Sequence, residues 1–149
     1  CNSQKSEKKE NIVTKTEKQV SFNIDGYYFP KDTIKYKEIE VLSILFSTKD
    51  EVDESNSNVI NKVYLNLLDI KSGKRIELVA ETFQLKNKVI NLSVSIPDIG
   101  VFSFNGTFLG KNGPMNDNVR ENETIVMKGK IEIGGDFKKE TDFSYFAGD

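Results

Sequence analysis

The sequence predicts an all-β fold, either an antiparallel β-sandwich or a small up-and-down barrel of eight or nine strands. Three observations favour this class. From position 20 onward, apolar residues recur with a period of two, and these segments are rich in Val, Ile, Phe, Tyr and Thr. Short turn signals separate the segments, and the 3.6-residue period of an amphipathic helix does not occur. We therefore expect strands joined mostly to their sequence neighbours, and no helix.

The first strand is predicted at 20–24, where Val20, Phe22 and Ile24 alternate with polar residues. The next apolar run, 36–47, differs because both of its alternations are partly apolar. One alternation holds Leu42, Ile44 and Phe46, and the other holds Ile39, Val41 and Leu45. Such a strand is covered on both sides, bends between two sheets, or offers its second face to a partner, and the sequence leaves these three alternatives open.

Turn chemistry defines the strands in the middle of the chain. The stretch 71–74 (Lys-Ser-Gly-Lys) joins a strand ending near Ile70 to one starting near Arg75. Further turns are predicted at 86–88 (Lys-Asn-Lys) and at 97–100 (Pro-Asp-Ile-Gly). Gly134 and Gly135 form the hairpin turn between the last two strands.

The remaining strands show one apolar face and one polar face, which is typical of antiparallel sheet packed on a core. The clearest is 90–96, with apolar residues at every second position. The apolar positions of these four strands are Ile90, Leu92, Val94 and Ile96; Phe102, Phe104 and Phe108; Ile125, Met127, Ile131 and Ile133; and Phe137, Phe143 and Tyr145.

Two connections are too long to be tight turns, 49–59 and 110–122, and both are rich in acidic and amide side chains. Exposed loops of this kind often carry binding residues, so we predict partner contacts there. Oxygen-rich side chains also suit Ca²⁺, but the glycine and ligand spacing of an EF-hand is missing, so we expect no metal site. The predicted contact residues are Asp50, Glu51, Asp53, Glu54, Asn56, Asn116 and Asp117.

Composition argues against catalysis and against nucleic acid as a partner. The 149 residues include no His and a single Cys, which removes the usual general base, the commonest metal ligand and any internal disulfide. The net charge of -2 provides no excess of basic side chains to neutralise phosphates. No nucleophile elbow, phosphate-binding glycine loop or metal-ligand cluster occurs. We therefore expect a binding protein without enzymatic activity or a noncovalent cofactor.

Residues 1–19 differ in composition from the rest of the chain. They contain no Phe, Tyr, Leu or Gly, and their five Lys and three Glu give a net charge of +2. A segment of this kind cannot form a core. We expect 1–19 to be a polar tether and 20–149 to be a single β domain.

The only cysteine, Cys1, stands immediately before this tether. The arrangement resembles mature bacterial lipoproteins, which implies a diacylglycerol on the Cys1 sulfur and an outer-membrane location. Two or more acyl chains suffice for stable membrane attachment. Residues 4–10 are similar to the short Lys and acidic signals of surface lipoproteins in Bacteroidota, but their acidic residues are dispersed. The periplasmic and cell-surface orientations therefore both stay open.

Two further short patterns point to known families. Asp32-Thr33-Ile34 is similar to the O-glycosylation pattern of that phylum, which implies a sugar on Thr33. The stretch 25–29 (Asp-Gly-Tyr-Tyr-Phe) is loosely similar to the Gly-X-Trp opening of lipocalins, but it lacks the Trp. We favour a turn followed by a pair of core aromatic residues at this point.

The leading hypothesis is a lipid-anchored outer-membrane accessory module, which binds a protein or serves as a subunit of a membrane protein complex. The first alternative is a lipocalin-like carrier, in which the Phe residues line a cavity for a small apolar ligand. The second alternative is an immunity or inhibitor lipoprotein that binds one toxin or enzyme.

Overall fold

The computed structural model describes residues 23–48, 60–111, 113–114, 117 and 119–148. These residues form ten strands and no helix, which confirms the all-β prediction with one strand more than the expected eight or nine. No helix in this part of the chain is long and apolar enough to cross a membrane. The strands are β1 (Gly26–Pro30), β2 (Ile34–Tyr36), β3 (Ile39–Thr48), β4 (Ile60–Asp69), β5 (Arg75–Val79), β6 (Thr82–Lys86), β7 (Val89–Ile96), β8 (Gly100–Phe108), β9 (Ile125–Ile133) and β10 (Phe137–Phe146).

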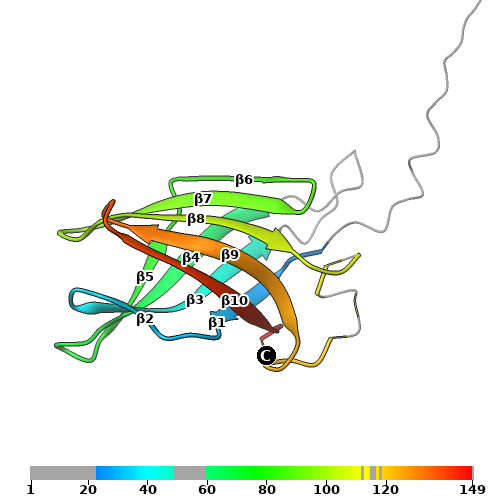
Figure 1. Cartoon of the computed structure of the whole chain (residues 1–149), viewed down its shortest axis with the longest axis horizontal. Coiled ribbons are helices and arrows are strands. Elements are labelled where there is room, and N and C mark those ends of the chain that lie inside the picture. The colour runs from blue at the N-terminus through cyan, green and yellow to red at the C-terminus, as the bar shows by residue number, and fades with distance from the viewer. Residues whose placement is uncertain (1–22, 49–59, 112, 115–116, 118, 149) are drawn as a thin grey trace, which may run out of the picture.

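All strands belong to one antiparallel sheet in the order β5-β4-β3-β1-β10-β9-β8-β7-β6, and β2 pairs with β3 beside this path. Most neighbours are consecutive in sequence, as expected for hairpin connections. The exception is β1, which pairs with β3 on one side and with β10 on the other. The first described strand therefore joins the early part of the sheet to its C-terminal part (Figure 1).

The two end strands of the path, β5 and β6, are consecutive in the chain and are joined by Ala80 and Glu81. The N–H of Ala80 donates to the Val63 carbonyl of β4 (2.8 Å), whereas the N–H of Glu81 donates to the Ser93 carbonyl of β7 (3.0 Å). This two-residue corner is thus held to both halves of the sheet. The sheet curls into a half-barrel, in which β3 and β4 pass behind β7–β10 in Figure 1.

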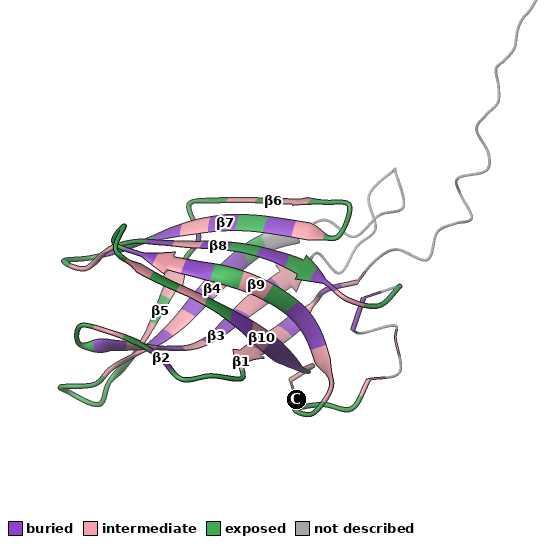
Figure 2. Ribbon diagram, in the orientation of Figure 1, coloured by how far each residue is buried: buried purple, intermediate pink, exposed green. Residues whose placement is uncertain are grey.

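The inner face of the curled sheet carries one hydrophobic core. At its centre the Tyr28 ring meets Phe46, Phe108 and Tyr145 edge-on, with centroid distances of 5.2, 5.6 and 5.2 Å. Edge-to-face aromatic pairs add about 0.5–1.5 kcal/mol each to the gain from burial. Buried and exposed residues alternate along β7 and β8, as the sequence predicted (Figure 2). In β9 the predicted alternation holds from Met127 onward, but Val126 is buried in place of Ile125, because the pairing with β10 shifts register at this point.

The run predicted as one strand at 36–47 is divided in the structure. β2 ends at Tyr36, and Lys37 takes a left-handed conformation (φ 54°) in the turn before β3. Within β3 the pairing with β4 shifts register between Val41 and Ser43. This bulge places one extra residue in the strand, so Val41 and Ile44 are both buried although they are three positions apart. The bulge explains why both alternations of this run are partly apolar.

The first predicted strand is only partly described. Val20 and Phe22 lie outside the described residues, and Ile24 precedes β1 without being part of a strand. Ile24 is nevertheless 1% exposed, and its carbonyl accepts a hydrogen bond from the Tyr28 hydroxyl (2.9 Å). β1 instead begins at Gly26, where φ is +134° and the Tyr145 ring leaves no room for a Cβ.

Candidate functional site

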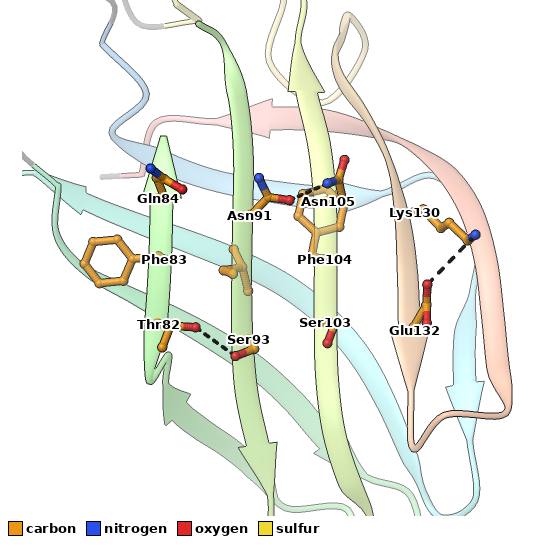
Figure 3. A pocket seen from close by; sticks show the side chains of 11 residues that line it. Thr82, Phe83, Gln84, Asn91, Ser93, Ser103, Phe104, Asn105, Lys130 and Glu132 are labelled. Atoms are coloured by element: carbon orange, nitrogen blue, oxygen red, sulfur yellow. Dashed lines mark hydrogen bonds and ion pairs between the residues drawn. The ribbon is translucent and has the colours of Figure 1, made fainter. Parts of the chain in front are cut away.

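The outer face of the curled sheet has two regions of contrasting chemistry, which we call its two outer faces. One is formed by β6–β9, and a hollow of about 400 Å³ lies over it. Its polar side chains form two rows that cross the strands in register (Figure 3). The first row is Gln84, Asn91, Asn105 and Lys130, and the second is Thr82, Ser93, Ser103 and Glu132.

The polar groups of this face are largely paired with one another. Thr82 and Ser93 share a hydrogen bond of 2.9 Å between their hydroxyls, and the Asn105 amide donates to the Asn91 side-chain oxygen. Lys130 Nζ lies 3.9 Å from a Glu132 carboxylate oxygen. Exposed pairs like these contribute little stability and leave few groups for a ligand. This polar face is typical of a sheet surface that faces solvent.

The second outer face, formed by β5, β4, β3, β1 and the end of β10, is apolar along one row. In register across the five strands lie Val79, Tyr64, Leu45, Tyr27 and Phe146. None of the five is fully buried, and Val79 is 49% exposed. We call this row the apolar row.

A hollow of about 680 Å³ adjoins the apolar row. Tyr27 forms one side of it, with ring centroids 6.3 Å from Phe29 and 6.4 Å from Phe146. Polar groups close the other side, where the Asn66 amide donates to the Ser43 hydroxyl (2.9 Å). Partly exposed aromatic and aliphatic side chains edged by polar residues are an arrangement found at protein interfaces. The hollow is lined by Tyr27, Phe29, Leu42, Ser43, Asn66, Arg75, Ile76, Glu77, Phe146 and Gly148.

The structure reaches only two of the residues predicted from sequence as functional. Asp117 is half-buried in the β8–β9 connection, where its N–H donates to the Gly113 carbonyl (2.8 Å). Thr33 is exposed between β1 and β2, where a sugar would find access, and its glycosylation stays a prediction. The other predicted residues lie outside the described residues and also stay predictions: Cys1, Asp50, Glu51, Asp53, Glu54, Asn56 and Asn116.

The aromatic residues after Gly26 divide between the two faces of β1. Tyr28 is fully buried, as expected for a core residue, whereas Tyr27 and Phe29 are only half-buried and line the outer hollow. The expected pair of core aromatic residues is therefore only half right, because Tyr28 alone is in the core and adjacent residues of a strand point to opposite faces. Sequence reasoning missed the apolar row. The one available signal was the second apolar alternation of 36–47, which includes Leu45.

Burial raises the pKa of Tyr145 to about 12, with Asp25 and Glu121 adding to the effect. The folded chain therefore holds this proton more tightly than the unfolded chain, where the ordinary value is 10.0. We expect this contribution to the free energy of unfolding to be complete below pH 10 and to be lost as pH rises toward 12. Urea denaturation at pH 8 and pH 11 measures the loss, and Tyr145→Phe should make it smaller. An equal loss in the Tyr145→Phe variant would contradict this assignment.

No group of three or more Asp, Glu, Cys or His side chains within the described ranges is placed to hold a metal ion. The chain matches no protein-family model, and no curated protein or solved structure is significantly similar to it.

Proposed function

We propose that this chain is an accessory module that binds a protein partner through the apolar row, and that the lipid expected on Cys1 holds it at an outer membrane. The observation that carries the proposal is the row itself. Five apolar side chains, contributed by five strands, lie in register on an outer face without full burial. Burying such a row against a partner gains about 25 cal/mol for each Å² of apolar surface removed from water.

The contrast with the polar face supports binding on one side of the molecule only. A sheet with both outer faces in water would carry polar residues on each, as β6–β9 do. Tyr and Phe are enriched at protein interfaces, and Tyr64 and Tyr27 combine apolar rings with a hydroxyl that tolerates water. The absence of His from the whole sequence also favours binding over general acid–base chemistry.

The two alternative functions receive different support. A carrier needs interior space, whereas the described core residues pack ring against ring, including Phe104 and Phe143 at a centroid distance of 5.2 Å. An immunity or inhibitor lipoprotein would use the same apolar row against a single toxin or enzyme. It is therefore a narrower form of the proposed function.

Site-specific photocrosslinking tests the proposal. Benzoylphenylalanine replaces Tyr64 in the apolar row and, in a matched strain, Asn91 on the polar face. After irradiation of intact cells that express the full chain, we expect one stoichiometric protein adduct from position 64 and none from position 91. Tyr64→Ser is expected to weaken co-purification of that adduct partner about tenfold or more, since a buried Tyr is a common hot spot. Equal adducts from both positions would refute binding through the apolar row.

Two further measurements complete the test. Native mass spectrometry of the chain purified from membranes should show a protein subunit, and a bound small apolar molecule in its place would favour the carrier. Cys1→Ser should move the chain out of the detergent-extracted membrane fraction. Retention of this variant in the membrane fraction would contradict lipid anchoring while leaving the apolar row untouched.

A further inference from the structure

The end strand β5 presents backbone groups that no neighbouring strand covers within the described residues, because β5 stands at one end of the sheet path. In an antiparallel pair, only every second residue directs its N–H and C=O toward a given neighbour. The N–H of Ala80 donates to the Val63 carbonyl, and the N–H of Asp69 donates to the Lys74 carbonyl, both at 2.8 Å. Between these two bonds, the N–H and C=O groups of Ile76 and Leu78 therefore point toward β4. Those of Arg75, Glu77 and Val79 point toward the open edge.

A small hollow of about 270 Å³ lies beside this edge; most of its lining is apolar, and Glu38, Asp69 and Asp98 also line it. β5 approaches β7 at the corner with β6 and runs away from it toward Arg75, as Figure 1 shows. Between the diverging segments, Ile76 and Leu78 of β5 face Ile96 and Ile99 of the β7–β8 region. Ile76, Leu78 and Ile99 pack against the core but are only partly buried. The apolar residues of the inner face are thus not fully covered next to the open edge.

The outward side chains of β5 carry opposite charges at alternate positions. Arg75 and Glu77 are both exposed. Their cross-strand neighbours on β4 are Leu68 and Asn66, which carry no charge. Opposite charges placed directly across an antiparallel pair are favourable, and like charges are unfavourable. A strand added at the open edge would therefore bind more favourably if it carried an acidic residue beside Arg75 and a basic residue beside Glu77.

We propose that an extended segment of a partner protein adds to the sheet as an antiparallel strand on the β5 edge. Its backbone pairs with Glu77 and Arg75, and its inward apolar residues beside Leu78 and Ile76 fill the hollow. Its outward residues are basic opposite Glu77 and acidic opposite Arg75. This mode of recognition takes affinity from main-chain hydrogen bonds and specificity from alternate side chains. The inference rests on the proposed function, because it names one contact through which a protein partner is held.

Synthetic peptides test the edge directly. The matched probe is the capped hexapeptide Thr-Leu-Lys-Ile-Glu-Thr, in which Lys meets Glu77 and Glu meets Arg75. The control probe, Thr-Leu-Glu-Ile-Lys-Thr, has the same composition with the charges exchanged. In ¹H–¹⁵N NMR titrations of the full chain, we expect the matched probe to bind about tenfold more tightly. The shifted amides should be those of β5 and of the segment around Ile96 and Ile99, and not those of β8 and β9.

A charge-reversed protein provides the decisive comparison. In the double variant Arg75→Glu with Glu77→Arg, the preference between the two peptides should invert, since both exposed charges change sign without loss of apolar contacts. N-methylation of the peptide Lys removes the N–H that would donate to the Glu77 carbonyl, and it should abolish binding of the matched probe. Absence of binding up to about 5 mM peptide would overturn the inference. Binding without inversion, or binding that survives N-methylation, would overturn it equally.

The peptide and crosslinking experiments distinguish the two proposals. A protein adduct from position 64 together with failure of the peptide titrations refutes strand addition and leaves the apolar row as the binding surface. Inversion of peptide preference without any adduct from position 64 supports the edge and refutes the apolar row.

Discussion

Replacing Tyr28 by alanine is expected to lower the free energy of unfolding by about 4 kcal/mol. This value lies within the range of losses measured when large aromatic residues are truncated in a core. Tyr28 has no exposed surface, and its ring contacts three other aromatic rings at 5.2–5.6 Å. These rings come from β3, β8 and β10, so the cavity would open where both halves of the curled sheet meet. Typical domains are stable by only about 5–15 kcal/mol, and this loss is a large share of that.

Tyr28→Phe is the matched control, because it keeps the ring and removes only the hydroxyl. The hydroxyl donates to the Ile24 carbonyl (2.9 Å), and the variant loses this buried hydrogen bond. We expect a cost of about 1 kcal/mol, measured by urea denaturation at pH 7. Similar losses in the Ala and Phe variants would show that the hydrogen bond, and not the ring packing, makes the contribution of Tyr28.

The second large effect is expected at Gly129, where even one methyl group has no room. A Cβ at this position would lie 2.5 Å from the Phe104 ring and 2.7 Å from the Asn105 carbonyl oxygen. Gly106, directly opposite on β8, is covered by the same ring, so Phe104 lies over a cross-strand glycine pair. We expect Gly129→Ala to cost about 2–3 kcal/mol through overpacking, as measured by urea denaturation.

A double-mutant cycle separates this steric cause from a general effect of changing a glycine. Phe104→Ala alone should cost about 3–5 kcal/mol, because it empties the space over both glycines. In the Phe104→Ala background only the contact with the Asn105 carbonyl oxygen remains, so Gly129→Ala should cost about 1 kcal/mol, and the coupling energy should be about 1–2 kcal/mol. Additive costs would show that the Phe104 ring is not what excludes a side chain at Gly129.

The sequence was sufficient to predict strands wherever one face meets the core and the other meets water. In β7 and β8 the apolar positions predicted from alternation are the ones found buried. The turn at 86–88 is also confirmed, since Asn87 and Lys88 both take positive φ (52° and 69°), as a two-residue hairpin turn requires. Local pattern and turn chemistry determine these elements, so no distant contact is needed to identify them.

Features that depend on pairing between distant segments were not predicted. The alternation in β3 is interrupted by the bulge after Val41, and a single extra residue reverses which positions face inward. The apolar row exists only because Tyr64, Leu45 and Tyr27 come into register across three strands. In sequence each of the three stands next to a residue that belongs to the core, so the local pattern does not mark it as part of an outer surface. Apart from the second face of 36–47, the predicted contacts therefore lay in the two loops rich in charge.

The insertion of β1 between β3 and β10 has a consequence for biosynthesis. Tyr27 pairs with Phe146, so the earliest described strand meets its second partner only after all the strands between them have left the ribosome. Until then, one edge of β1 has no strand to pair with, and such edges attract other chains. Pairing across so long a separation also makes folding slow. A nascent chain with this topology would gain from a chaperone that shields the edge until β10 can pair with β1.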